Sequence, residues 1–413
     1  MPRSRTPRLA ALAAAATAVA LLLGPAPLAA ADQGVRSQSL PAPQLLPVPQ
    51  FLPIPPDAVS SMVWGLNRDG AVVGEYYPNA PAQAAPRAIR WHPDHLGYTT
   101  LAPLPGDQSS RPHGFNDADT VVGVSFQTLS DNHPVRWAPD GTPTALELPP
   151  GVRGGGAQGI NNAGVVIGGA YDWNYRPTPL KWQPDGTRVA LPLLPGDDSG
   201  STSSVNNAGI IAGTSERRLS GDSQEHPVLW SPTGAVTALP LPTGIAGARV
   251  DEMTDGGVVL GHGRKAGSAE FDRVLVWAPD GTVRDAGYGR TRAVNDAGTA
   301  VGAAFDATHS QHAARWDPDG TQTLLGDPAG KQSEAMAVNG TGTAVGEAQG
   351  PDWTRSTALL WKPDGTAVPL PPSPLSPYAQ AGFINDDGVI AGNAVELDAA
   401  GQPVAGHAVV WGP

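Results

Sequence analysis

Residues 157–195 read AQGINNAGVVIGGAYDWNYRPTPLKWQPDGTRVALPLLP, and the pattern of this stretch recurs along the whole chain. Its Trp belongs to a series of eight, spaced by 39 to 50 residues: Trp91, Trp137, Trp182, Trp230, Trp277, Trp316, Trp361 and Trp411. Seven of these Trp residues are preceded by an Asn, which in six copies opens the motif Asn-x-x-Gly-x-x-x-Gly. Agreement among eight copies identifies an internal repeat, and such a repeat indicates the fold more directly than a single short motif can.

Each repeat is predicted to form four short strands, which we call a to d. Strand a ends at the Asn, where Asn-x-x-Gly suits a type I turn, and a Val- and Ile-rich strand b follows, as in 164–168. Strand c ends at the Trp, a tight turn such as Pro184-Asp185-Gly186 comes next, and the Leu-rich strand d follows it. Four antiparallel strands in about 45 residues match the size of a β-propeller blade.

The two ends of the repeat region predict a closed ring. The last copy stops at residues 411–413 without a strand d, whereas Phe51-Leu52-Pro53-Ile54-Pro55 looks like an isolated strand d. Pairing the two would complete the last blade and remove an unpaired sheet edge. We therefore predict an all-β, closed propeller of eight four-stranded blades over residues 51–413. A seven-bladed ring or an open solenoid is the alternative.

Residues 1–31 have the pattern of a secretory signal peptide. Arg3, Arg5 and Arg8 form a basic region, an apolar run covers 9–23, and 29–31 (Ala-Ala-Ala) offers a cleavage site. The apolar run of about 15 residues is shorter than the roughly 20 that a membrane-spanning helix needs. We expect a secreted, extracellular protein in which residues 32–50 form a Pro-rich linker of extended character.

Composition narrows the classes of function. Gly (51) and Pro (44) together make up 23% of the 413 residues, which excludes a coiled coil or a large helical bundle. The chain has no Cys, which excludes a disulfide scaffold, a thiolate zinc site, an iron–sulfur protein and a Cys nucleophile. The net charge is −12, or −15 without the three Arg of residues 1–31, which argues against nucleic acid and anionic membranes as partners.

The repeat resembles the HAF repeat of bacterial extracellular repeat proteins. A small residue, then Ile/Val-Asn-x-x-Gly-x-Val-x-Gly, leads to a His-Ala before the Trp, as in His312-Ala313 and His407-Ala408. The pairs at 133–134 and 226–227 (His-Pro) come close, while Ala, Val and other aliphatic residues stand where the family has Phe. The resemblance covers about residues 51–413. It implies secretion and a repeat architecture, and it implies no reaction.

One position of the repeat, three residues before the Asn, differs in every copy and is a candidate ligand ring. Strand a is innermost in a propeller, so we expect this position near the mouth of the central channel. The alternative to a ligand ring is neutral drift at a solvent-exposed position. The fifth copy departs most from the pattern, with Thr254 for the Asn and a Glu at 252, and local departures are expected at functional sites. The eight residues of the ring are Trp64, His113, Gln158, Ser203, Asp251, Arg292, Met336 and Gly382.

The loop between strands b and c is the second variable region. The b–c and d–a loops of a propeller share one face, and binding residues concentrate on loops that a rigid scaffold holds. Exposed aromatic side chains there suit stacking on sugar rings or anchoring of a protein partner. The aromatic candidates are Tyr76, Tyr77, Trp173, Tyr175 and Trp353, and the charged ones are Asp172, Arg217, Arg218, Arg264, Lys265 and Asp352.

Several other patterns have plainer explanations. The four His before the Trp, at 133, 226, 312 and 407, are expected roughly 20 Å apart on strand c, too far to share a metal ion. Gly154-x-Gly156-x-x-Gly159 has the letters of a dinucleotide fingerprint, but it lies before strand a of the third copy and no helix follows. The motifs GxSxG and HExxH, the P-loop and the EF-hand loop are absent.

The sequence therefore favours a secreted, non-enzymatic binding propeller that engages a glycan, a cell-envelope component or a protein at the rim of variable loops. The alternatives are a purely structural surface protein and a polysaccharide-acting hydrolase or lyase with its site at the channel mouth. We expect no cofactor, no metal, no nucleic acid, no membrane insertion and a monomer; calcium in the acidic turns at 106–107 and 196–198 stays open. The candidate catalytic residues of the enzyme alternative are His113, Asp251, Glu252, His262 and Arg292.

Overall fold

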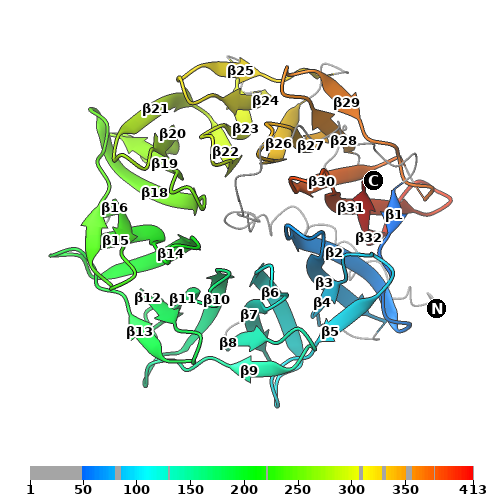
Figure 1. The fold of residues 1–413 in the computed structure, drawn as a ribbon, viewed down its shortest axis with the longest axis horizontal. Helices are drawn as coiled ribbons and strands as arrows, with labels where there is room; N and C mark the ends of the chain where they lie inside the picture. Colours follow the sequence, from blue (N-terminus) through cyan, green and yellow to red (C-terminus); the bar gives the residue numbers. More distant parts are fainter. Residues whose placement is uncertain are drawn as a thin grey trace, which may run out of the picture.

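The computed structural model describes residues 49–79, 85–128, 131–219, 222–306, 310–327, 332–349, 356–375 and 377–412. The regular elements of these residues are β-strands, which form eight four-stranded antiparallel sheets arranged as a ring (Figure 1). The prediction of an eight-bladed propeller is thereby confirmed. The predicted signal peptide and nearly all of the predicted linker lie outside the described residues.

The blades follow one another along the chain, and strand a of each lies nearest the axis (Figure 1). Blades 1 and 2 contain β2 (Ala58–Leu66), β3 (Val72–Pro78), β4 (Arg87–Trp91), β5 (Tyr98–Leu101), and β6 (Ser109–Phe115), β7 (Val121–Phe126), β8 (Asn132–Trp137), β9 (Pro143–Ala145). Blades 3 and 4 contain β10 (Gly154–Ile160), β11 (Val166–Tyr171), β12 (Pro177–Trp182), β13 (Arg188–Ala190), and β14 (Ser199–Val205), β15 (Ile211–Leu219), β16 (Asp222–Trp230), β17 (Val236–Ala238). Blades 5 and 6 contain β18 (Ile245–Met253), β19 (Val259–Lys265), β20 (Phe271–Trp277), β21 (Val283–Tyr288), and β22 (Arg290–Val294), β23 (Ala300–Phe305), β24 (Gln311–Trp316), β25 (Gln322–Leu324). Blades 7 and 8 contain β26 (Ser333–Val338), β27 (Ala344–Ala348), β28 (Thr357–Trp361), β29 (Ala367–Pro369), and β30 (Ala379–Ile384), β31 (Ile390–Leu397), β32 (Pro403–Trp411) and β1 (Gln50–Phe51).

The N-terminal strand closes the ring, as predicted. Gln50 lies opposite Val410 and Phe51 opposite Val409, and the Leu52 N–H donates to the carbonyl of Ala408 at 3.0 Å. β1 thus serves as strand d of blade 8 and covers the edge of β32. Because Gln50 is paired, the propeller begins one residue before the predicted boundary.

The tight a–b turn of every blade and the c–d turn of blades 1–7 account for much of the glycine. At the a–b turn of blade 1 the Asn67 carbonyl accepts the N–H of Gly70 at 3.2 Å, and its Oδ1 accepts the N–H of Ala71 at 2.8 Å. Gly70 has φ of +89°, a left-handed conformation that glycine adopts without a steric cost. Blade 2 puts Asp119, with φ of +60°, at the equivalent place, and the Arg90 guanidinium binds that carboxylate. These turns fix the pairing register of strands a and b.

The eight repeated Trp side chains are fully buried between blades. Trp411, for example, packs with Leu360 and Leu370 of blade 7, the preceding blade. In seven blades the indole Nε1 also donates to a carbonyl that follows strand d of the preceding blade, and Trp91 uses Pro53 of the closing segment at 2.6 Å. The exception is Trp316, whose Nε1 has no partner where Gly289 alone joins β21 to β22. The Trp residues are therefore inter-blade scaffold.

The repeated Asn side chains link neighbouring blades as well as closing turns. Each Nδ2 donates to the backbone carbonyl of the next Asn in the pairs Asn67–Asn116, Asn116–Asn161, Asn161–Asn206, Asn295–Asn339, Asn339–Asn385 and Asn385–Asn67. Thr254 interrupts this circle. Its Oγ1 still accepts the N–H of Val258 at 3.2 Å, so the turn is kept, but threonine lacks the side-chain amide group that the Asn residues use to bind the next blade.

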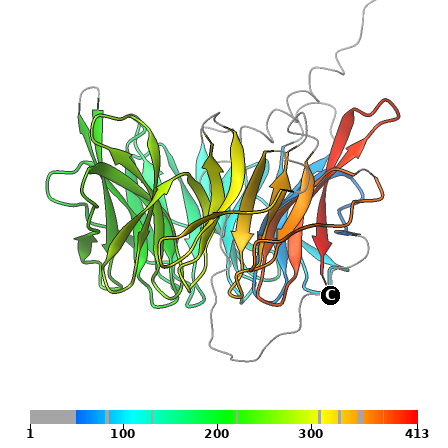
Figure 2. The same cartoon turned by 90° about the horizontal axis from the view of Figure 1, so that it is seen from above.

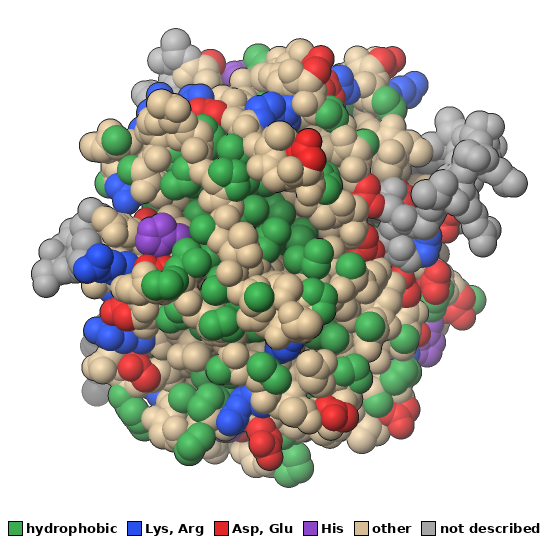
Figure 3. Space-filling model, turned by 60° about the vertical axis from the view of Figure 1, so that its left-hand side comes forward, with side chains coloured by type: hydrophobic (Ala, Val, Ile, Leu, Met, Phe, Trp, Pro, Cys, Tyr) green, Lys and Arg blue, Asp and Glu red, His purple; other side chains and the backbone are tan. Residues whose placement is uncertain are grey.

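The two faces of the ring differ in the length of their connections. In Figure 2 the b–c hairpins, such as β31–β32 at the right, project from one face, and the short a–b and c–d turns lie at the other. We call these the long-loop face and the short-turn face. Figure 3 shows that charged side chains of both signs are dispersed over one side of the molecule, with hydrophobic side chains gathered across its middle.

Candidate functional site

The variable position of strand a is the extra residue of a β-bulge in all eight blades. In every blade the pairing between strands a and b shifts register across this residue, which lies two positions before strand a ends. A bulge re-aims one side chain and breaks the local ladder. The eight residues therefore occupy equivalent places around the propeller, and a role in binding a ligand stays a prediction. These places lie toward the short-turn face, because strand a ends there.

The glycine found in all eight copies of strand b makes room for the bulge of strand a. A Cβ added at Gly74 would lie 2.0 Å from the carbonyl oxygen of Met62 on strand a, and the seven equivalent glycines have backbone oxygens at 1.9–2.2 Å. The kinked strand a therefore presses its backbone against strand b, where a side chain of any size is excluded. The sequence contained this signal, since an isolated glycine inside a strand indicates a bulge or a close backbone approach.

The preceding blade supplies hydrogen-bond acceptors to several bulges. At these bulges the residue before the bulged one donates its backbone N–H to a side chain of the preceding blade. In blade 1 the Val63 N–H donates to Asn393 Oδ1 at 2.9 Å, and in blade 5 the Val250 N–H donates to Thr214 Oγ1 at 3.3 Å. Blade 2 has Pro112 at this place, which has no N–H to donate. The bulges thus act as joints between blades, which explains why the acceptor residues differ from blade to blade.

The ring side chains themselves mostly bind a neighbouring blade. His113 Nδ1 lies 2.9 Å from the Ala157 carbonyl, and burial lowers the pKa of this imidazole. Gln158 is exposed, and its Oε1 accepts the Thr202 hydroxyl at 2.9 Å. Arg292 donates to Glu334 at 2.7 Å.

Trp64 is half-buried, and the guanidinium of Arg111 lies 5.8 Å from its ring. Like His113, Gln158 and Arg292, it faces a residue of the adjoining blade. The ring positions therefore contribute to blade–blade contact.

Blade 5 contains the densest polar contacts of the ring. Asp251 Oδ2 lies 2.5 Å from His262 Nδ1, and the Thr291 N–H of blade 6 donates to His262 Nε2 at 3.1 Å. An imidazole that accepts at Nε2 carries its proton on Nδ1, so it is the donor to Asp251. Both ring nitrogens of His262 are engaged, which leaves no lone pair for general-base work in this state.

Glu252 is next to Asp251 in the sequence, and its carboxyl group is buried without a hydrogen-bond partner of normal geometry among the described residues. Its side chain is 3% exposed, and neither carboxylate oxygen makes a hydrogen bond of normal geometry. Burial raises its pKa to about 8; the Val294 backbone opposes this shift in part, and Asp251 adds to it. Glu252 is therefore largely protonated at neutral pH.

The five candidates of the enzyme alternative do not come together as one site. Asp251, Glu252 and His262 share blade 5, whereas His113 lies in blade 2 and Arg292 pairs into blade 7. A general acid or base must reach its substrate within hydrogen-bond distance. The contacts of Asp251, His262 and Arg292 are instead directed into the protein.

The four His before the Trp each contact a carboxylate. His133 and His226 bind the d–a loop residues Asp107 and Asp197 at 3.0 and 2.9 Å, and each of these carboxylates also accepts a Ser hydroxyl at 2.6 Å. His312 binds Asp306 and His407 binds Glu396. In the described residues, no group of three or more His, Cys, Asp or Glu could hold a metal ion.

Most of the predicted b–c loop candidates lie in strands. Tyr76 was expected on an exposed loop, but it lies in β3, is 6% exposed and packs in the core, where burial raises its pKa. Tyr77 follows it in β3, and its hydroxyl donates to buried Glu75 at 2.6 Å. The prediction was wrong because strand b continues past the expected end, so the alternating pleat turns Tyr76 inward.

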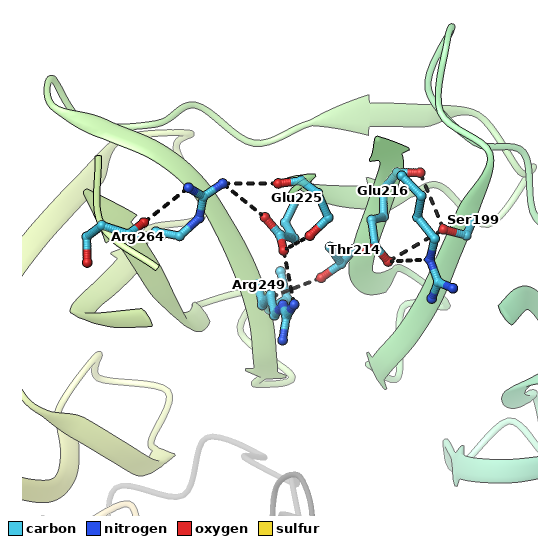
Figure 4. A network of polar contacts seen from close by, with 10 residues as sticks. Ser199, Thr214, Glu216, Glu225, Arg249 and Arg264 are labelled. Carbon is cyan, nitrogen blue, oxygen red and sulfur yellow. Dashed lines mark hydrogen bonds and ion pairs between the residues drawn. The ribbon is translucent and has the colours of Figure 1, made fainter. Parts of the chain in front are cut away.

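The arginines of blades 4 and 5 show the same extension of strands. Arg217 and Arg218 lie in β15, and Arg264 and Lys265 lie in β19. Arg264 points at Glu225 of blade 4, which is 2% exposed, and Arg249 binds the same carboxylate at 3.0 Å (Figure 4). This network joins blades 4 and 5, although within the described residues Glu225 Oε2 has only the Arg264 ion pair and makes no hydrogen bond of normal geometry.

Among the b–c loops that the structure describes, that of blade 3 displays the predicted aromatic side chains on its surface. It spans residues 172–176, and Asp172 Oδ1 accepts the N–H groups of Asn174 and Arg176 at 2.8 and 2.9 Å. These bonds hold the pKa of Asp172 below its usual value. The two residues between the anchors, Trp173 and Tyr175, are 70% and 59% exposed.

Arg153, from the d–a loop, completes what we call the blade 3 platform: Arg153, Tyr171, Trp173 and Tyr175. Its guanidinium carbon lies 4.6 Å from the Tyr175 ring centroid and 5.8 Å from that of Trp173, and it donates to the Tyr175 hydroxyl. Tyr171 stacks on Tyr175 at 6.2 Å with an interplanar angle of 13°. The platform lies on the long-loop face, away from the inner ring.

The supposed dinucleotide fingerprint has a packing role here. Gly154 lies within β10 itself, where a Cβ would be 2.8 Å from the Tyr171 hydroxyl. The missing side chain leaves room for the Tyr171 ring at the base of the platform. The motif lies within strand a itself, not before it as expected, and the helix that a dinucleotide fingerprint needs does not follow it.

Some predictions fall on other parts of the chain. Trp353 and Asp352 lie outside the described residues. The acidic turn residues Asp107 and Asp197 use their carboxylates on His and Ser, as described above. No helix in the described ranges is long and apolar enough to cross a membrane.

Comparison with known proteins supports the architecture. No protein-family model matches the chain, and no curated protein matches it. A prolyl endopeptidase resembles it with a TM-score of 0.52 and 14% identity over 86% of this chain and 54% of that one. A puromycin hydrolase has a TM-score of 0.50 and 14% identity over 82% of this chain and 59% of its own. A streptogramin B lyase has a TM-score of 0.39 and 13% identity over 72% of this chain and 92% of its own. At these identities the likeness shows the propeller fold alone.

Proposed function

We propose that the chain is a secreted, non-enzymatic binding propeller of the HAF-repeat type, which engages its ligand at the blade 3 platform on the long-loop face. The ligand classes that suit such a platform are a glycan, a cell-envelope component or a protein. One observation carries the proposal: Trp173 and Tyr175 are displayed on a loop that does not need them.

The b–c loop of blade 8 shows what this turn requires. Asp398 accepts the N–H groups of Ala400 and Gln402 at 2.9 and 2.8 Å, the same bonds that Asp172 makes in blade 3. Where blade 3 has Trp173, blade 8 has Ala399. The turn therefore forms without an aromatic residue.

Tyr175 is moreover a costly choice for folding. It has φ of +57°, and the matching residue of blade 8 is Gly401 with φ of +74°. A non-glycine residue in this region costs about 1 kcal/mol or more, and such outliers cluster at ligand sites. Fold stability would favour Gly at 175, so the retained aromatic side chain supports a binding role.

The structure supports binding over the enzyme alternative. The ionisable groups proposed for catalysis bind one another or neighbouring blades, as Asp251–His262 and Arg292–Glu334 show. The platform, by contrast, exposes its aromatic faces to solvent. A purely structural protein would have no use for an exposed Trp, because large apolar groups on a surface favour association.

Removal of Trp173 tests the proposal. We expect Trp173→Ala to weaken binding to the retained ligand at least tenfold, since stacking on an exposed aromatic ring and its desolvation contribute about 1–3 kcal/mol. A glycan array and a pull-down from envelope material would find the ligand, and calorimetry would measure the affinity.

Leu96→Ala is the matched control, because Leu96 is 77% exposed but lies in a c–d turn on the short-turn face. It should bind as the unaltered protein does. If no ligand is retained, or if Trp173→Ala binds as tightly as the unaltered protein, the proposed function is wrong.

A further inference from the structure

Arg153 is a cation without a counter-ion in the middle of the blade 3 platform. Its guanidinium contacts two aromatic rings and one hydroxyl, and no carboxylate of the described residues lies within ion-pair distance of it. Most other arginines that line this face bind an acid, as Arg176 binds Asp198 at 3.3 Å and Arg264 binds Glu225. Arg217 on the same face likewise has no carboxylate partner among the described residues, so what distinguishes Arg153 is its place beside the rings of Trp173 and Tyr175.

The acidic residues near the platform are committed elsewhere. The Asp172 carboxylate accepts two backbone N–H groups of its own loop, and Asp198 binds both Arg176 and the Arg218 N–H. Asp131 lies 3.6 Å from His133 Nε2. The platform thus combines two exposed aromatic faces with one uncompensated positive charge.

We propose that the platform selects acidic polysaccharides, in which each sugar ring carries a carboxylate. This inference rests on the proposed binding function and adds the ligand class. The apolar C–H face of a sugar stacks on Trp173, and the ring carboxylate binds Arg153, which lies over Tyr175. A neutral sugar would satisfy the aromatic rings and leave the guanidinium unpaired.

The guanidinium geometry favours a carboxylate over other anionic contacts. Arg has five N–H donors in a planar fork, and among the described residues the Tyr175 hydroxyl accepts from one of them. Stacking on Tyr175 fixes the plane of the fork, so little side-chain entropy is lost when a second, in-plane partner binds. A carboxylate fits such a fork with two parallel hydrogen bonds.

Matched polymers test the inference. The probes are a short oligogalacturonate and its methyl ester, which have the same ring and length but differ in charge. Calorimetry with the full protein should show about 10- to 100-fold tighter binding of the acid form, the range expected for one charge-assisted hydrogen-bonded pair. Added salt should weaken binding of the acid form and leave the ester unchanged.

Substitutions locate the selectivity. Arg153→Gln should abolish the preference for the acid form and leave ester binding unchanged, and Arg153→Lys should retain part of the preference because lysine keeps the charge without the fork. Trp173→Ala should weaken binding of both probes. Arg217→Gln is the control, since it removes one exposed positive charge from β15 of blade 4 on the same face.

The two proposals fail in different ways. Equal affinity for both probes, or an unchanged preference in Arg153→Gln, overturns the acidic-polysaccharide inference and leaves a binding platform. Binding of a protein ligand that Trp173→Ala abolishes, without binding of either probe, also overturns it. If Trp173→Ala changes the binding of no ligand, the proposed function falls as well.

Discussion

Glu252 occupies a place that other blades fill with small or apolar residues. At this place, the last but one residue of strand a, blades 1, 3 and 6 have Gly65, Gly159 and Ala293. The carboxyl group of blade 5 is buried there with no hydrogen bond of normal geometry and a pKa of about 8. The sequence showed the departure, but composition could not tell a channel-facing acid from one packed between strands.

This burial makes stability depend on pH. The folded protein keeps the proton up to about pH 8, whereas the unfolded chain releases it near pH 4.5, so the folded state holds one proton more between these values. Stability therefore falls as pH rises through this window and is unaffected by Glu252 below it. Glu252→Gln should remove that fall and raise the free energy of unfolding at pH 8 by about 2–4 kcal/mol.

Urea unfolding between pH 4 and 9 would measure the effect, with Glu75→Gln as the control. Glu75 is equally buried but binds Arg111 at 2.9 Å, so its loss should destabilise the protein. A pH profile of Glu252→Gln parallel to that of the unaltered protein would show that the buried carboxyl is not the cause.

Strands and turns were predictable because their causes are local. Each Asn-x-x-Gly and Pro-Asp-Gly sets a turn by its own dihedral preferences, and strand c ends at the Trp in every blade. The lengths of strands b and c were not predictable, because a strand continues only as far as its partner strand pairs with it. The pairing of β3 through Tyr76 and of β15 through Arg218 depends on the partner strand in this way. The bulge on strand a also depends on the partner strand, and its only signal in the sequence is the repeated glycine of strand b that lies opposite it.

The blade 3 loop yields a prediction at the scale of one element. Asp172→Ala removes the acceptor of the Asn174 and Arg176 N–H groups, so the loop should lose its fixed shape while the propeller stays folded. We expect hydrogen exchange of these two amides to accelerate at least tenfold, and ligand binding to weaken, because ordering the loop would then oppose association.

Asp398→Ala is the matched control for this prediction. It should loosen the equivalent turn of blade 8 in the same way and leave ligand binding as it was, since Ala399 and Ala400 present no aromatic face. Protection of the Asn174 amide that persists in Asp172→Ala would show that the carboxylate does not hold the loop.

The whole ring depends on a very short closing strand. β1 contributes two residues to blade 8, and Pro53 beyond it accepts the Trp91 indole N–H of blade 1. The sequence predicted this closure because a missing strand at one end matched a spare strand at the other. The location of the proposed binding platform was less predictable, since it depends on which variable loops expose their side chains.

Truncation tests closure at the scale of the molecule. A chain that begins at residue 53 lacks β1, so it should unfold at lower denaturant concentration and associate through the exposed edge of β32. A chain that begins at residue 49 should behave as the full protein does. Moving residues 49–55 to follow residue 411 should restore stability, as light scattering and urea unfolding would show. Equal stability of the chains that begin at 49 and 53 would contradict the closing role.

Closure by β1 also has a consequence for the order of folding. Gln50 pairs with Val410, 360 residues later, so the segment synthesised among the first finds its partner among the last. For a flexible chain, joining ends this far apart costs about 5 kcal/mol of loop entropy. Local hairpins of low sequence separation form faster, and each completed blade brings the two ends nearer. We therefore expect the ring to be assembled blade by blade and sealed at the end, so that until closure β32 would present an open edge to any other unfinished chain.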